Sequence, residues 1–157
     1  MPTTESKTLE TILVVDDNEF VLNLVVSILR NANFQVLSAH DGVAALKLAA
    51  ETESQVHLLL SDVEMPLLSG PDLGQELKAT RPDLRVMLMS GGSNSGNLLV
   101  LNYGWAYIQK PFVASKLVEM INHVLHSPDR SQPGGQEFDS RKDNVLQRGA
   151  GQNEKLE

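Results

Sequence analysis

Residues 56–66 read VHLLLSDVEMP, and this stretch indicates the kind of sheet that the chain builds. Its centre is apolar at every position instead of alternating between apolar and polar, and Asp62 follows directly. Such a pattern is typical of a strand that is buried on both faces, as in a parallel sheet covered by helices on both sides. We therefore predict a strand over residues 56–61, with a carboxylate at its carboxyl end.

The same unit, a short apolar run followed by an amphipathic helical stretch, recurs along the chain. The expected strands are residues 11–15, 34–39, 56–61, 84–89 and 105–109. Expected helices run from an N-cap at Asn18 to a stop at Asn33, after the turn at residues 41–42, over 72–80, around 97–103 and over 113–125. Five such units predict an α/β domain with a doubly wound parallel sheet.

Composition divides the 157 residues into one domain and two polar ends. The chain is 41% hydrophobic and 21% charged, which is ordinary for a globular protein. Residues 1–7 and 127–157 are poor in apolar side chains, and the second segment is rich in proline, glycine and charge, so both are expected to be disordered. The folded domain is expected over residues 8–126.

Charge and the absence of cysteine exclude several classes of function. With a net charge of -7, the chain is repelled by nucleic acid, and no cluster of Lys and Arg offsets this. Without cysteine it has neither disulfides nor zinc–thiolate sites. Neither a signal peptide nor an apolar run long enough to span a bilayer stands out, so we expect a cytoplasmic protein with no membrane contact.

Polar side chains stand where four of the expected strands end. They are Asp16 and Asp17 after the first strand, Asp62 after the third, Ser90 after the fourth and Lys110 after the fifth. Carboxyl ends of parallel strands meet at one edge of a sheet, which is where such folds bind ligands. Three converging carboxylates repel one another unless a cation is present, and an all-oxygen cluster suits Mg²⁺. Together with an amine and a hydroxyl, they predict a phosphoryl-transfer site with a carboxylate nucleophile.

These motifs, in this order, resemble the receiver domains of response regulators over about residues 8–126. The matching segments are Asp16-Asp17, Asp41-Gly42 with Ala45-Leu46, residues 62–66 with Gly70, Ser90, and Tyr107 before Lys110-Pro111-Phe112. The resemblance implies a flavodoxin-like (βα)5 sandwich with strand order 2-1-3-4-5. It also implies two-component signalling, with a histidine kinase or a histidine phosphotransfer protein as the phosphoryl donor.

The resemblance assigns roles to individual residues. Asp62 would be the phosphoacceptor, and Asp17, Asp62 and the backbone carbonyl of Glu64 would bind Mg²⁺ or Mn²⁺, with Asp16 holding metal-bound water. Lys110 would contact the phosphoryl group, and the Lys110-Pro111 bond would be cis. Ser90 and Tyr107 would be the switch pair. Such a protein is not an enzyme in its own right, but it assists its own phosphorylation and dephosphorylation.

Several readings stay open beside this one. Asp16-Asp17 would also serve as a helix-capping pair, Tyr107 as a core side chain, and His123 with His126 as a metal pair or as cations at a helix end. A haloacid-dehalogenase-like phosphohydrolase also uses an aspartate nucleophile, although Glu64 stands where that family has a second aspartate. A scaffold receiver that is never phosphorylated is a further alternative. The side chain of Glu64 either is inert or tunes the metal affinity and the lifetime of the phosphoryl group.

No charged residue occurs from Ser90 to Gln109, and residues 98–101 form a continuous apolar run. The resemblance places an output surface on the fourth helix, fifth strand and fifth helix. We therefore expect a hydrophobic contact there, with an unknown output protein or between two copies, in a protein that is otherwise a monomer or a weak homodimer.

Overall fold

A computed structural model describes residues 8–91 and 103–128. Five parallel strands form one sheet in the order β2-β1-β3-β4-β5. The strands are β1 (Thr11–Val15), β2 (Gln35–Ala39), β3 (Leu58–Asp62), β4 (Arg85–Ser90) and β5 (Ala106–Gln109). The described helices are α1 (Glu19–Asn31), α2 (Gly42–Glu51), α3 (Gly70–Thr80) and α5 (Ala114–His126). The expected doubly wound α/β fold and its strand order are confirmed.

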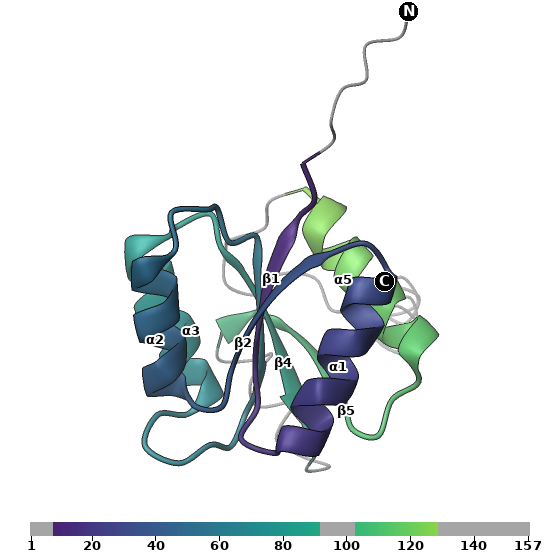
Figure 1. Cartoon of the computed structure of the whole chain (residues 1–157), viewed down its shortest axis with the longest axis horizontal. Coiled ribbons are helices and arrows are strands. Elements are labelled where there is room, and N and C mark those ends of the chain that lie inside the picture. Colours follow the sequence, from purple (N-terminus) through teal and green to yellow (C-terminus); the bar gives the residue numbers. More distant parts are fainter. Residues whose placement is uncertain (1–7, 92–102, 129–157) are drawn as a thin grey trace, which may run out of the picture.

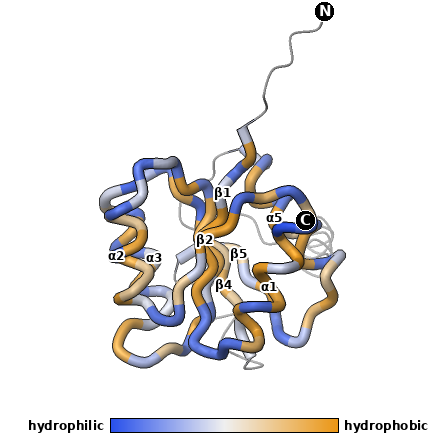
Figure 2. The backbone as a smooth tube through the Cα atoms, in the orientation of Figure 1, coloured by the Kyte–Doolittle hydropathy of each residue, from blue (hydrophilic) through white to orange (hydrophobic). Residues whose placement is uncertain are grey.

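The helices cover both faces of the sheet, α1 and α5 on one side and α2 and α3 on the other (Figure 1). Side chains along β1 alternate between the two layers. Ile12 and Val14 pack with Leu22 and Leu117 on the α1/α5 side, whereas Leu13 packs with the α2/α3 cluster. Figure 2 shows the hydrophobic centre of the sheet as a band between the two helical layers. Burial on both faces is the physical reason why the strands are apolar throughout.

Side-chain caps start three of the described helices, α1 and α2 soon after the preceding strand and α3 after a longer loop. Asn18 accepts a hydrogen bond from the Val21 N–H, as expected, and Asp41 accepts one from the Ala44 N–H. Ser69 caps α3 in the same way. Each cap satisfies a backbone donor that would otherwise be unpaired at a helix start. The caps therefore set where the chain turns back along the sheet.

Element boundaries differ from the expected ones by one or two residues. Strands β2, β3, β4 and β5 begin at Gln35, Leu58, Arg85 and Ala106, and α3 begins at Gly70 because Ser69 caps it. Helix α1 ends at Asn31, and Asn33, the expected stop, follows with a left-handed φ of 70°. The apolar pattern that predicts these boundaries reports burial, and burial extends past the hydrogen-bonded strand. Phe34 and Val56 are buried although they lie outside β2 and β3.

Three expectations fall mostly outside the described residues. The expected helix around residues 97–103 lies outside them except for Tyr103, and the apolar run 98–101 lies wholly outside. The expected disordered segments 1–7 and 127–157 also lie outside, except for Ser127 and Pro128. Among the helices of the described part, none is long and apolar enough to cross a bilayer.

Candidate functional site

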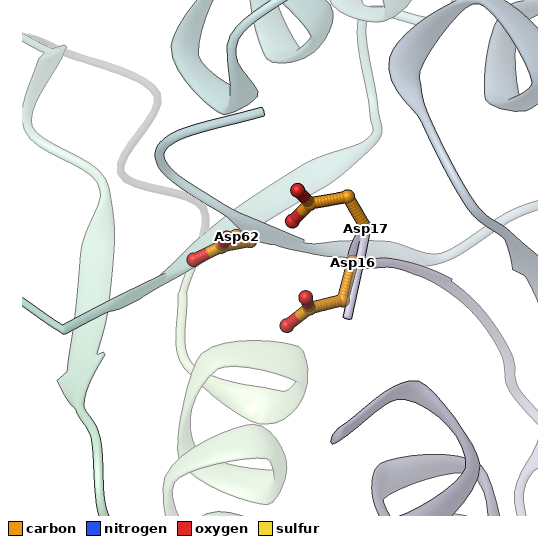
Figure 3. Close-up of side chains that lie close together, drawn as sticks. All are labelled: Asp16, Asp17 and Asp62. Carbon is orange, nitrogen blue, oxygen red and sulfur yellow. The ribbon is translucent and has the colours of Figure 1, made fainter. Parts of the chain in front are cut away.

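The carboxyl ends of β1 and β3 lie side by side and bring the three predicted aspartates together. Asp16 and Asp17 follow β1, and Asp62 ends β3, paired in register with Met89 of β4. One carboxylate oxygen from each of the three residues lies within 4.8 Å of those from the other two. Figure 3 shows Asp16 and Asp17 directed toward the side on which Asp62 lies. The predicted convergence of residues 46 positions apart is therefore correct.

The three carboxylates differ in their exposure to water. Asp16 is fully buried, the side chain of Asp62 is 13% exposed, and Asp17 is exposed. Asp16 accepts a hydrogen bond from the Asn18 N–H at 2.9 Å, which holds its carboxylate at the start of the loop to α1. Asp17 thus faces the solvent from which an ion or a substrate arrives.

Lys110 joins the cluster from the loop after β5. Its Nζ lies 2.9 Å from Asp16 Oδ2 and 3.2 Å from Asp62 Oδ1, so one ammonium contacts two of the three carboxylates. The Lys110-Pro111 bond is cis, as expected. The Lys110 N–H also donates to the Ser90 carbonyl at 2.7 Å, which ties this loop to the end of β4.

Electrostatics in the site reflect partial burial and mutual charge. Burial, followed by the nearby charges of Asp16 and Asp17, raises the pKa of Asp62, and Lys110 offsets only part of that rise. Burial alone would lower the pKa of Lys110, but its bonds to Asp16 and Asp62 outweigh this effect and raise its pKa. Lys110 therefore stays a cation, and Asp62 holds its negative charge less firmly than a solvated aspartate does.

Backbone contacts fix the loop that follows Asp62. The Val63 N–H donates to the Met89 carbonyl at 3.0 Å, and the Gly70 N–H donates to the Val63 carbonyl at 2.9 Å. A Cβ on Gly70 would lie 2.2 Å from the Asp62 carbonyl oxygen, so only glycine fits there. The start of α3 thus rests directly against the backbone of Asp62.

Of the remaining predicted site residues, Ser90 and Glu64 lie at the same edge of the sheet and Tyr107 lies within β5. Ser90 ends β4 and is 2% exposed, opposite Gln109 in register. Tyr107 is half-buried on β5 and packs against the α2/α3 cluster. Glu64 is exposed in the loop after Asp62, and the metal-binding role of its backbone carbonyl stays a prediction.

The donor set fits a hard divalent cation. It consists of carboxylate oxygens only, it includes the exposed Asp17, and it carries three negative charges against the single charge of Lys110. Mg²⁺ takes one or two protein carboxylates and completes its shell with water and phosphate oxygens. The cluster therefore has both the chemistry and the excess negative charge that such an ion requires.

Sequence reasoning missed two features of the site. The first is the ion pair between Asp16 and Lys110, because the sequence placed Asp16 only among the groups around the metal. The second is the close approach of Gly70 to the Asp62 backbone, because Gly70 was used only as a motif position. The burial of the short run 11–16 was the available signal for the first, because a buried carboxylate needs a partner.

Among the other candidates, His126 pairs with Glu10 at 3.0 Å, at the opposite edge of the sheet from the aspartates.

Comparison with known proteins agrees with this geometry. The family model of the response regulator receiver domain matches residues 12–122. The sensor kinase CckA of Brucella abortus is 31% identical over 121 residues, which cover 76% of this chain and 13% of the kinase. The transcriptional regulatory protein CpxR of Klebsiella pneumoniae is 39% identical over 115 residues, which cover 73% of this chain and 48% of CpxR. The chain thus spans about half or less of these relatives.

A solved structure shows the same fold. The crystal structure of a response regulator receiver domain protein from Clostridium thermocellum superposes with a TM-score of 0.68 at 29% sequence identity. The match covers 74% of this chain and 94% of that one. The fold, the aspartate cluster and the family match together define a signalling domain of the class that phosphorylation controls. The chain belongs to the response regulator receiver family and is a receiver domain of two-component signal transduction.

Proposed function

We propose that Asp62 is the phosphoacceptor of this receiver domain. The observation that carries the proposal is the contact of Lys110 Nζ with both Asp16 and Asp62, which places a fixed cation beside one of the two Asp62 oxygens. Asp62 combines a carboxylate nucleophile, partial exposure and a raised pKa, whereas Asp16 is fully buried and Asp17 has no contact with Lys110 in the described structure.

The reaction is a transfer between two carriers. An Asp62 carboxylate oxygen attacks the phosphorus of a phosphohistidine, the P–N bond breaks, and the imidazole leaves with a proton from water. The product is an acyl phosphate on Asp62. Lys110 then stabilises the phosphoryl oxygens as a point charge, and Ser90, at the adjacent strand end, donates a hydroxyl hydrogen bond to one of them.

A divalent cation, Mg²⁺ or Mn²⁺, would be held by the side chains of Asp17 and Asp62 and by the Glu64 backbone carbonyl, with Asp16 binding through water. When bound, this ion neutralises the charge that develops on the phosphoryl oxygens. Asp16 keeps Lys110 in place through its 2.9 Å ion pair, so the buried carboxylate orients the cation that faces the substrate. The donor is a histidine kinase or a histidine phosphotransfer protein, and the chain has no catalytic turnover beyond its own phosphorylation and dephosphorylation.

The output of the phosphorylated state is a protein contact. Ser90 moves toward the new phosphoryl group, Tyr107 turns inward, and the surface expected from residues 97–103, β5 and α5 changes. The support is the position of Ser90 and Tyr107 on the adjacent strands β4 and β5, together with the lack of charge from residue 90 to 109. Neither nucleic acid nor a membrane is part of this output.

Incubation with acetyl phosphate and Mg²⁺ tests the assignment. The intact mass should rise by one phosphoryl group in the wild-type chain and should not change in Asp62→Asn. Asp17→Asn should show the same modification only at much higher Mg²⁺ concentration, because it removes a metal ligand. Phosphorylation of Asp62→Asn at the wild-type rate would contradict the assignment. A wild-type chain that accepts no phosphoryl group would favour a scaffold, and turnover of a generic phosphate ester would favour a phosphohydrolase.

A further inference from the structure

An aromatic side chain at the start of β5 reaches the helix that adjoins Asp62. Trp105 immediately precedes β5, is partly buried, and stacks on Tyr103 with ring centroids 4.6 Å apart and an interplanar angle of 16°. The outer edge of its indole lies against Gly74 of α3, where a Cβ would be 2.9 Å from both Cη2 and Cζ3 of the indole. The indole is therefore in close contact with the backbone of α3.

Gly74 is an unfavourable residue for the helix in which it lies. It stands in the interior of α3, where glycine is less favourable than any other residue except proline. Alanine would stabilise the helix, but its Cβ would collide with the indole of Trp105. The same Cβ would lie 3.3 Å from Val86 Cγ1, a tight contact that a small shift relieves. The contact with Trp105 therefore accounts for the glycine, whereas the stability of the helix by itself does not.

One turn before this contact, the same helix touches the backbone of Asp62. Helix α3 begins at Gly70, where a Cβ would lie 2.2 Å from the Asp62 carbonyl oxygen. Gly70 and Gly74 are four residues apart, so they lie on one face of the helix, about 6 Å apart along its axis. A shift of α3 at Gly74 is passed on to Asp62, because no side chain separates Gly70 from the Asp62 backbone.

The Asp62 carboxylate tolerates little displacement. Its Oδ1 lies 3.2 Å from Lys110 Nζ, already near the long end of the range for a hydrogen bond. In phosphoryl transfer the attacking oxygen must lie in line with the leaving group, and a misplacement of about 1 Å lowers a rate about 100-fold. A contact remote from the carboxylate therefore affects the rate if it fixes the backbone from which the carboxylate projects.

We propose that Trp105 is a positioning residue for Asp62. Its indole, seated on Gly74, holds the first turns of α3 against the Asp62 backbone and so fixes the direction of the Asp62 carboxylate toward Lys110. This inference rests on the proposed role of Asp62 as the phosphoacceptor. It accounts for the glycine in the interior of α3 and for the large aromatic side chain before β5 by a single contact. Trp105 takes no part in the chemical step.

The test exchanges volume between Trp105 and Gly74 in the full-length chain. Trp105→Phe keeps a ring that stacks on Tyr103 but lacks the outer edge of the indole, so it leaves a gap over Gly74. Gly74→Ala adds a methyl group that collides with the indole. In the double variant, the methyl group occupies the gap that the shorter ring leaves. Gln75→Ala, at an exposed position of the same helix, controls for helix propensity.

Two quantities are measured at a temperature at which every variant is folded. They are the rate of phosphorylation by phosphoramidate at saturating Mg²⁺, followed by intact mass, and the dissociation constant of Mg²⁺, from isothermal titration calorimetry. Each single variant should be phosphorylated about tenfold more slowly, as expected for a displacement well below 1 Å, and should bind Mg²⁺ more weakly. The double variant should recover to within about twofold of the wild-type chain, and Gln75→Ala should match it.

A lower thermal midpoint in both single variants, with wild-type rates and Mg²⁺ affinities, would make the contact purely structural and would overturn the inference. Losses that simply add in the double variant would overturn it as well, because the two residues would then act independently. Failure of the wild-type chain to accept a phosphoryl group would instead count against Asp62. The Mg²⁺ affinities, weakened in the single variants and restored in the double variant, would still test the role of Trp105.

Discussion

Lys110 and Asp16 are 94 positions apart in the chain, yet the Lys110 Nζ lies 2.9 Å from Asp16 Oδ2. The Asp16 carboxylate is fully buried and the Lys110 side chain is 22% exposed, and this contact is shorter than the 3.2 Å contact of Lys110 with Asp62. A buried carboxylate without its partner is costly, whereas the intact pair is close to neutral for stability. The intact pair therefore serves mainly to hold the ammonium of Lys110 in position. Loss of one partner would also destabilise the fold.

Substitution of Lys110 by methionine should destabilise the domain and abolish phosphorylation. The side chain of Met is of similar length, but Asp16 would be left buried and uncompensated beside two further carboxylates. We expect a loss of about 3 kcal/mol in the free energy of unfolding, measured with urea. Mg²⁺ should stabilise the variant more than the wild-type chain, because it replaces part of the missing positive charge. Lys110→Arg should keep most of the stability, and an equal loss in both variants would assign the effect to packing.

Substitution of Gly70 by alanine should be much more damaging than substitution of Gly91. A Cβ on Gly70 meets the Asp62 carbonyl at 2.2 Å, whereas a Cβ on Gly91 meets nothing within 4 Å. Overpacking of this kind costs about 1–3 kcal/mol, and here it also displaces Asp62. Thermal unfolding should show a midpoint several degrees lower for Gly70→Ala and nearly unchanged for Gly91→Ala. Phosphorylation with acetyl phosphate should slow only in the first, and similar behaviour of the two variants would contradict the account of the loop.

We propose that residues 129–157 are dispensable for folding and phosphorylation. A chain that ends at Pro128 should keep its thermal midpoint, because it retains the contacts of Arg85 with the carbonyls of Val124 and Ser127. A chain that ends at residue 123 loses both acceptors at the end of α5 and should unfold several degrees lower. Differential scanning calorimetry of the two truncations locates the C-terminal boundary of the folded domain. A large loss in the longer one would show that the tail packs on the domain.

The output surface is tested by a charge in the apolar run. Leu99→Lys and Val100→Lys should be made separately, and at least one should abolish phosphorylation-dependent binding while Asp62 phosphorylation stays intact. Sedimentation velocity with and without acetyl phosphate detects self-association, and a pull-down with the phosphorylated chain detects a partner. Tyr107→Ala should have the same effect, because the proposed switch passes from Ser90 through Tyr107 to this surface. Binding that survives both changes would rule out this output route.

The sequence alone determined the class of fold and the residue types of the site. Strands such as Leu58–Asp62 are apolar on both faces, and that pattern is local, so it predicts a parallel sheet without knowledge of any contact. The convergence of the polar residues at the strand ends was predictable as well, because parallel strands end at a common edge of the sheet. Caps such as Asn18 were also predictable, since a cap acts within four residues.

Only the tertiary structure decided how those residues divide the work. Whether Asp16, Asp17 or Asp62 meets Lys110 depends on side-chain directions and burial across four strands, which no local pattern encodes. The closure of the Asp62 loop by Gly70 and the left-handed turn at Leu67 likewise depend on contacts between β3, α2 and α3. Sequence periodicity reports which face of an element is buried, because burial is an average over many neighbours. A single 2.9 Å ion pair depends on two particular side chains, and it is fixed only when the whole sheet is assembled.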